Sequence, residues 1–188
     1  PLWSRGLGDV YKRQTYDSPN AGSRTVTTNL AASDFTAGAG TLLDNYVLPT
    51  SASGAGLIQR AALGVSIIGI PTKTYDATTL AVLAPGNYSF IGFAPGEGAT
   101  VLQTSGTYAS PNAGFRQIDT VLGAADFAPT GSTLLDNYIL PTSASGIGLI
   151  ERAVLTATII GNPTKTYDAT TAATLTSANY ALSGFVAG

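Results

Sequence analysis

The sequence predicts an all-β protein built from tandem copies of one small domain. Three observations carry this prediction: a long internal repeat without gaps, short runs in which apolar and polar side chains alternate, and a charged fraction of only 11%. Soluble domains typically carry about 25% charged residues, and a solvated helix needs Glu, Lys and Arg on its outer face. The scarcity of charge therefore favours strands that expose Thr and Ser.

The repeat relates residues 15–96 to residues 107–188, and 51 of the 82 aligned positions are identical. The longest identical run is "PTKTYDATT", which begins at Pro71 and again at Pro163. Shorter identical runs are "SPNAG", "TLLDNY" and "LPTSASG". A period of this length suits one autonomous domain per repeat and is too long for one rung of a solenoid.

The alternating runs predict roughly six or seven strands per repeat. One face of each strand is expected to point into the core, and turn signals such as "APGEGA" and "SASGAG" separate the strands. "AASDFTAG" is compatible with one short helical turn, and we expect a small β-sandwich or a β-grasp-like unit. The residues expected to face inward are Val26, Thr28 and Leu30; Leu63, Val65 and Ile67; Ile118, Thr120 and Leu122; and Leu155, Ala157 and Ile159.

The opening residues differ in composition from the rest of the chain. The hexapeptide "DVYKRQ" resembles a translated transposon end from sequencing libraries, so we interpret residues 1–14 as an artefactual leader. We expect residues 15–61 to be the C-terminal part of one repeat domain, 62–153 one complete domain, and 154–188 the N-terminal part of the next. Each partial domain should expose an apolar face and a sheet edge, which the complementary piece of another chain would complete.

Composition also limits the chemistry that the chain offers. It has no cysteine and no histidine, which removes thiolate nucleophiles, Cys-type zinc sites and the commonest general base. We find no set of nucleophile, base and orienting residue, so we expect no enzyme, no catalytic residues, no bound metal and no cofactor. A net charge of −2 argues against a nucleic-acid partner, and no apolar run reaches the ~18 residues of a membrane span.

"KTYDATT" followed by "NYSFIGF", with "NYVLP" and "GLIQRAAL" before the next unit, resembles the YDG-type repeats of bacterial filamentous-haemagglutinin-like adhesins, which are similar to MBG repeats. The resemblance covers residues 15–188. It implies a very large protein, secreted by a two-partner system to the bacterial cell surface, in which the repeats form a stalk. The implied partners are neighbouring repeats, and glycans or proteins of host or bacterial surfaces.

One position departs from that family. The glycine that usually follows Tyr-Asp is replaced by Ala77 and Ala169. Alanine would be strained there if the backbone needed a positive φ, so we expect an ordinary backbone conformation at both alanines.

The recurrent "TYD" residues are the first candidate site: Tyr75 and Asp76, with their copies Tyr167 and Asp168. We expect a structural turn in which each carboxylate caps backbone N–H groups. The alternative is calcium binding, although calcium usually takes several acidic ligands.

Lys73 and Lys165 are the only lysines after the leader. With Asn45 and Asn137 they raise the alternative of an isopeptide cross-link, against the simpler expectation of a solvated lysine beside a turn. Arginines also recur at fixed positions, and we expect them to form ion pairs at strand edges or between domains. These arginines are Arg24, Arg60, Arg116 and Arg152.

Recurrent tyrosines offer an alternative function, because aromatic rings can stack on sugars. We expect such rings more often to pack in the core with a bonded hydroxyl. The candidate glycan contacts are Tyr46, Tyr88, Tyr138 and Tyr180.

Overall fold

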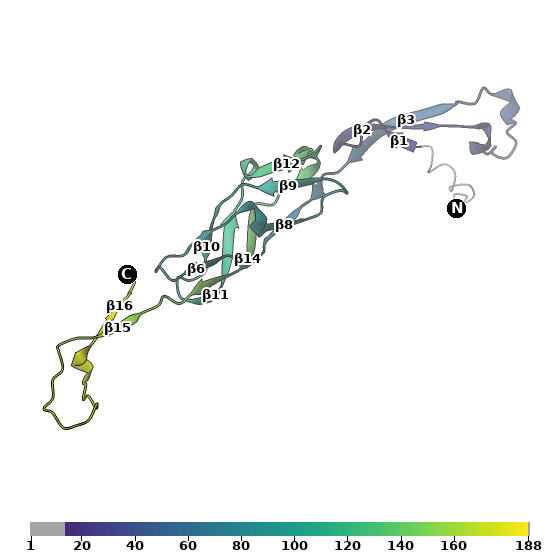
Figure 1. Ribbon diagram of the computed structural model, residues 1–188. Helices are drawn as coiled ribbons and strands as arrows, with labels where there is room; N and C mark the ends of the chain where they lie inside the picture. Colours follow the sequence, from purple (N-terminus) through teal and green to yellow (C-terminus); the bar gives the residue numbers. More distant parts are fainter. Residues whose placement is uncertain (1–13, 188) are drawn as a thin grey trace. The chain divides into compact units, whose positions relative to one another are not determined.

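The computed structural model describes residues 14–187, and in this range the regular secondary structure consists of β-strands and single 3₁₀ turns joined by loops (Figure 1). The predicted all-β class is confirmed. No helix within the described range is long and apolar enough to span a membrane. The predicted leader lies outside the described residues except for Gln14, which opens the first strand.

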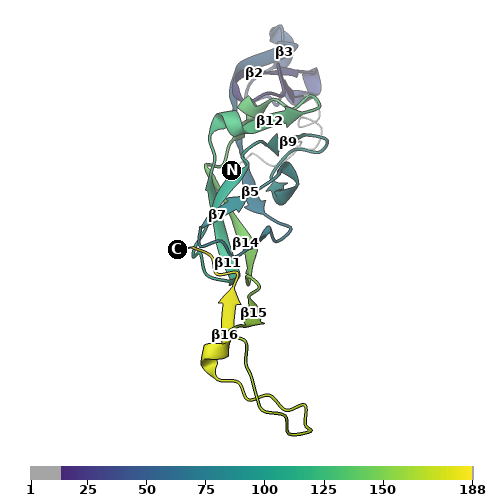
Figure 2. The same ribbon diagram turned by 60° about the vertical axis from the view of Figure 1, so that its left-hand side comes forward.

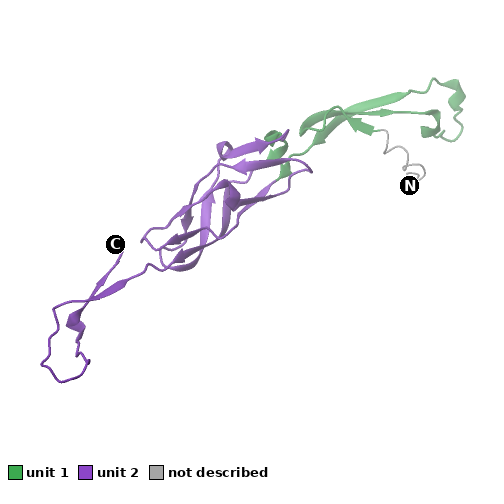
Figure 3. Cartoon of the chain, in the orientation of Figure 1, with its two compact units in different colours: residues 1–62, 134–139 green, residues 63–133, 140–188 purple. Residues whose placement is uncertain are grey.

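The chain separates into two compact units, coloured separately in Figure 3. The first comprises the chain up to residue 62 together with residues 134–139, and the second comprises residues 63–133 and 140–188. The partition of the chain into one complete and two partial repeat domains stays a prediction.

The first unit contains a three-stranded antiparallel sheet in the order β1-β2-β3, and a short parallel pair of β4 with β13. Strands β2 and β3 are paired along their whole length, from Gly22 opposite Ile58 to Asn29 opposite Ser51. The strands are β1 (Gln14–Tyr16), β2 (Gly22–Asn29), β3 (Ser51–Ile58), β4 (Ala61–Ala62) and β13 (Tyr138–Ile139), and the 3₁₀ turns are η1 (Ala32–Asp34), η2 (Leu43–Asn45) and η5 (Leu135–Asn137).

The second unit is built on a five-stranded sheet in the order β6-β14-β11-β10-β7, in which only β6 and β14 run parallel. Strands β11 and β14 lie side by side in both ribbon views (Figures 1 and 2). The sheet strands are β6 (Thr72–Thr74), β7 (Leu80–Val82), β10 (Ser105–Tyr108), β11 (Gly114–Val121) and β14 (Ser143–Glu151).

Three two-stranded ladders complete this unit, pairing β5 with β8, β9 with β12, and β15 with β16. Three 3₁₀ turns lead directly into β8, β12 and β16. The bounds are β5 (Gly64–Ile67), β8 (Tyr88–Ile91), β9 (Gly98–Val101), β12 (Phe127–Thr130), β15 (Thr156–Ile159), β16 (Tyr180–Ser183), η3 (Pro85–Asn87), η4 (Ala124–Asp126) and η6 (Ser177–Asn179).

The buried apolar side chains of the described residues all lie between Leu63 and Ile150. The predicted alternation is confirmed within this stretch: Ile118, Thr120 and Leu122 are buried on one face of the sheet. The same pattern in the copies gives a different result. Val26, Thr28 and Leu30 are only half-buried, and Leu155, Ala157 and Ile159 are exposed, so the inward face expected for the copies at residues 155–159 is not covered.

Strand β14 is crossed at close range by the backbone that runs from Ile67 to Pro71. A Cβ atom at Gly146 would collide with the Ile67 carbonyl, and one at Gly148 would lie 2.6 Å from the Pro71 carbonyl oxygen. The Leu149 N–H donates to that same Pro71 oxygen at 2.9 Å. Glycine is therefore required in this strand so that the second layer can pack directly on the sheet backbone.

The same glycine in the other repeat copy has no such neighbour. Nothing lies within 4 Å of the position where Gly54, the counterpart of Gly146, would carry a Cβ atom. Among residues 14–62 and 134–139 of the first unit no strand corresponds to β5, so the backbone that covers Gly146 has no described equivalent over Gly54.

We expect Gly146→Ala to lower the free energy of unfolding by about 3 kcal/mol, because the added methyl forces the crossing backbone away from the sheet. Gly54→Ala is the matched control and should change stability by less than about 0.5 kcal/mol. Urea denaturation followed by circular dichroism measures both. Equal effects of the two substitutions would show that the close crossing does not limit packing.

Candidate functional site

The "KTYDATT" segment forms a closed turn between β6 and β7. The Asp76 carboxylate oxygen Oδ1 accepts hydrogen bonds from the Thr78 N–H at 2.9 Å, from the Thr78 hydroxyl at 2.9 Å and from the Lys73 ammonium at 2.7 Å. Lys73 also donates to the Thr78 carbonyl at 2.8 Å. This is the geometry of an Asx turn with a lysine clamped across its open side.

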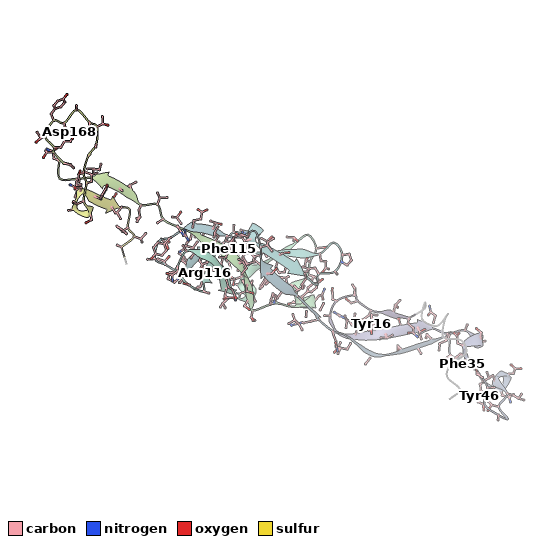
Figure 4. All side chains as sticks on the ribbon, turned by 90° about the horizontal axis from the view of Figure 1, so that it is seen from below. Tyr16, Phe35, Tyr46, Phe115, Arg116 and Asp168 are labelled. Carbon is pink, nitrogen blue, oxygen red and sulfur yellow. The ribbon has the colours of Figure 1, made fainter. Side chains whose placement is uncertain are left out.

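The second copy repeats this network almost atom for atom. Asp168 Oδ1 accepts from the Thr170 N–H at 3.0 Å and from the Lys165 ammonium at 2.9 Å. All residues from 161 to 170 are exposed and none of them lies in a strand, and Figure 4 shows Asp168 on this loop. The turn therefore forms from its own seven residues and needs no packed sheet beside it.

The backbone within this turn corrects the expectation for the two alanines. Ala77 has φ of 62° and Ala169 has φ of 55°, so both adopt the left-handed conformation and the predicted ordinary backbone is wrong. The carboxylate of each aspartate holds the N–H two residues ahead, which turns the residue between them into this region. A left-handed alanine is strained by roughly 1–2 kcal/mol.

Lys73 is more enclosed than its copy. Its side chain is 17% exposed against 40% for Lys165, and its ammonium lies 5.6 Å from the centroid of the Tyr108 ring. The Tyr108 hydroxyl donates to the Pro71 carbonyl at 2.8 Å. In residues 62–153, called the middle repeat from here on, the turn is thus fixed to the core through a cation–π contact.

Two alternatives remain for the lysine and the aspartate of this turn: an isopeptide cross-link and calcium binding. Asn137 directs its amide to Asn20 and Ala21, whereas Lys73 directs its ammonium to the turn. Within residues 14–187, no three acidic, histidine or cysteine side chains gather as a metal site would require. Both alternatives stay predictions.

The tyrosines of the middle repeat differ in exposure from their sequence copies in residues 15–61 and 154–187. Tyr88 and Tyr138 are 8% and 5% exposed, whereas their copies Tyr180 and Tyr46 are 51% and 64% exposed. The Tyr88 hydroxyl donates to the Gln103 carbonyl at 2.8 Å, and burial raises its pKa. Rings buried in this way are not available to a sugar, so the glycan hypothesis rests on Tyr46, labelled in Figure 4, and Tyr180.

Two recurrent arginines form none of the expected ion pairs with other described residues. Arg24 donates to the carbonyls of Asn20 at 2.7 Å and Ala21 at 3.0 Å. Arg116 likewise donates to the carbonyls of Asn112 and Ala113, at 3.0 Å each. Among the described residues these guanidinium groups serve the "SPNAG" turns, because the carbonyls of each turn converge three and four residues before the arginine.

Sequence reasoning missed the role of Asn137. Its Oδ1 accepts from the Ala21 N–H at 2.8 Å, and its Nδ2 donates to the Asn20 side-chain oxygen at 3.1 Å. Both partners belong to the first unit, although more than a hundred residues separate them. The signal was present in the sequence, since "SPNAG" and "LDNY" each recur unchanged.

The comparison with protein families bears on the middle of the chain. Residues 59–146 match the YDG domain. The match confirms the YDG-type part of the predicted resemblance, and it contains the turn at Asp76 and most of the sheet strands of the second unit. No curated protein and no solved structure matches the chain.

We expect Ala77→Gly to raise the free energy of unfolding by about 0.5–1 kcal/mol. Glycine relieves the left-handed strain and returns part of that gain as unfolded-state entropy. Ala84→Gly is the matched control: Ala84 is exposed with φ of −130°, so it should lose about 0.5 kcal/mol. Chemical denaturation measures both, and a loss at Ala77 equal to that at Ala84 would contradict the strain.

The Asp76 carboxyl predicts how stability depends on pH. Its pKa is lowered from 3.8 to about 2, chiefly because Lys73 donates to it and then because Thr78 does. A lowered folded-state pKa means that the unfolded chain binds the proton more tightly. The contribution to stability is therefore complete above about pH 4 and is lost as the pH falls towards 2.

Asp76→Asn should flatten this part of the pH dependence when urea midpoints are measured from pH 5 to pH 2. Asp168→Asn is the control. Its carboxyl also has a lowered pKa, through Lys165, but its turn lies among exposed residues, so the midpoint of the buried core should keep the wild-type dependence. If Asp76→Asn and wild type lost stability in parallel over this range, the Asp76 turn would not be coupled to global unfolding.

Proposed function

We propose that the chain is part of a structural stalk in a large bacterial surface adhesin, in which YDG repeats hold an adhesive region away from the cell. Secretion and exposure at the cell surface belong to this proposal. The stalk is a spatial function that requires no catalysis, and its nearest partners are the neighbouring repeats of the same protein.

One observation supports this proposal most directly. The residues that recur unchanged and that make the contacts of the middle repeat are framework residues: Tyr108 and Tyr138 are buried, Gly146 and Gly148 admit the crossing backbone, and Asp76 closes a turn. The residues that recur are therefore those that pack the core or form the turns. A repeated spacer needs this, since each copy must reproduce the same fold.

The alternative is a glycan-binding β-module. The observation in its favour is that Tyr46 and Tyr180 are more than half exposed. Glycan-array binding by the chain, lost in Tyr46→Ala and Tyr180→Ala, would favour this function over the stalk.

A stalk predicts how length depends on repeat number. Chains that carry one, two or three copies of residues 62–153 between the same flanking segments should gain an equal increment of maximum dimension for each copy, measured by small-angle X-ray scattering. A rigid array lengthens in proportion to copy number, whereas a flexibly linked one lengthens roughly as its square root. Square-root growth would contradict the stalk.

A further inference from the structure

The turn that Asn137 contacts is also held by hydrogen bonds among its own residues. Asn20 donates its N–H to the Ser18 hydroxyl at 3.2 Å, Arg24 bonds the two carbonyls of the turn, and Gly22 has φ of 124°. The Ala21 N–H and the Asn20 amide then receive Asn137. The contact joins the "LDNY" loop of one sequence repeat to the "SPNAG" turn of the preceding one.

The second "SPNAG" turn has the same geometry. Asn112 donates its N–H to the Ser110 hydroxyl at 3.2 Å, Arg116 bonds the two carbonyls, and Gly114 has φ of 121°. Within residues 14–187, however, neither the Ala113 N–H nor the side-chain amide of Asn112 has a hydrogen-bond partner, and Asn112 is exposed where Asn20 is half-buried. The turn is a preformed acceptor for a second asparagine.

A pocket of about 350 Å³ adjoins this turn in the second unit, and its lining is mainly apolar. Its wall includes Ala153, which corresponds in sequence to Ala61, and Ala61 pairs with the buried Tyr138 beside the first turn. The pocket therefore stands where a second "LDNY" loop would place its tyrosine. Ala113 of the turn and Tyr75 also line it.

The chain also carries a second copy of the "LDNY" loop, at residues 43–46. Turn η2 repeats the backbone of η5, with φ and ψ of −106° and 110° at Leu42 against −105° and 103° at Leu134. Asn45 is exposed and its side-chain amide has no partner among the described residues, and Tyr46 is 64% exposed. The loop and its acceptor are thus both preformed and both unoccupied.

The sheets at the two ends are complementary in the same sense. In the middle repeat β14 also pairs with β6, and β10 pairs with β7. Among the described strands, their counterparts β3 and β1 have only β2 as a neighbour, while residues 164–166 and 172–174, the counterparts of β6 and β7, are not in strands. The β1-β2-β3 sheet therefore lacks the two outer strands that residues 164–166 and 172–174 have the sequence to form.

The apolar faces match as well. A hollow of about 290 Å³ lies over β2 and β3, and its lining includes Val26, Thr28, Ala52 and Gly54. The counterparts of the first three are Ile118, Thr120 and Ala144, which are at most 5% exposed. Ile67 covers Gly146, and its counterpart Ile159 is 60% exposed.

We propose that a second copy of this chain docks head-to-tail at these surfaces. The Leu42–Tyr46 loop of one copy binds the Ser110–Ala113 turn and its pocket on another, and Asn45 makes the bonds that Asn137 makes within one chain. Residues 154–187 of the receiving copy complete the sheet of the first by strand addition. The contact is heterologous, so assemblies grow with concentration.

The first test is the mass of the intact chain, measured by sedimentation equilibrium over a concentration series. Wild type should form concentration-dependent oligomers. Asn45→Ala should weaken association about tenfold (~1.4 kcal/mol) through the loss of two hydrogen bonds, with an unchanged urea midpoint. Asn137→Ala is the matched control, since it removes the intrachain contact and should leave the association constant within about twofold.

Gly54→Val provides an independent variant, because nothing occupies the space near Gly54 in the single chain. It should leave the urea midpoint unchanged and abolish association by blocking the incoming strand. A monomeric wild type at all concentrations overturns the proposal. So does association that neither Asn45→Ala nor Gly54→Val weakens.

Cross-linking identifies the contact, because the chain has no cysteine of its own. A mixture of Asn45→Cys and Asn112→Cys chains, treated with a short bismaleimide, should give a covalent heterodimer. Replacing Asn45→Cys by Ser33→Cys, another exposed position, should not. If a chain carrying both Asn45→Cys and Asn112→Cys cross-links only within itself, the acceptor turn is used intramolecularly and head-to-tail docking is wrong.

Discussion

The close crossing of β14 by the backbone from Ile67 to Pro71 is the contact on which the rest of the middle repeat depends. It brings the residues just after β5 against a strand some eighty positions later, so the core closes only when both are present. Gly146 and Gly148 permit the approach, Leu149 and Tyr108 bond the Pro71 carbonyl, and β6 then extends the sheet beside β14. The corresponding segments elsewhere in the described chain lack one partner of the crossing, and none of their apolar side chains is fully buried.

This dependence separates what local sequence encodes from what tertiary contact adds. The Asx turns at Asp76 and Asp168 are alike although only the first sits beside a sheet. Residues 164–166 and 72–74 are likewise identical, yet only the latter form a strand, because strand β14 offers a partner to one and not to the other. Hydrogen bonds between side chain and adjacent backbone survive without a core, whereas strands need a neighbour.

The all-β class and the inward faces of the middle repeat could be predicted because alternation of apolar and polar residues is a local pattern. The backbone of Ala77 could not be predicted in the same way. Its left-handed conformation is imposed by the hydrogen bond from Thr78 to the Asp76 carboxylate. Nothing in the identity of the alanine itself indicates that conformation. The partners of Arg24 and Arg116 could not be predicted for a related reason. Both side chains donate to backbone carbonyls, and every residue type carries the same carbonyl.

Strain in the repeat is concentrated where chain direction must change over few residues. Ile70 follows Gly69 with φ of 48°, and the second copy places Asn162 at the same point with φ of 46°. A β-branched side chain is poorly suited to this region, whereas asparagine tolerates it. The turn nevertheless persists with isoleucine in the middle repeat, because the Pro71 carbonyl that follows is fixed by Leu149 and Tyr108. Packing of residues 67–71 on β14 thus holds Ile70 in its left-handed conformation.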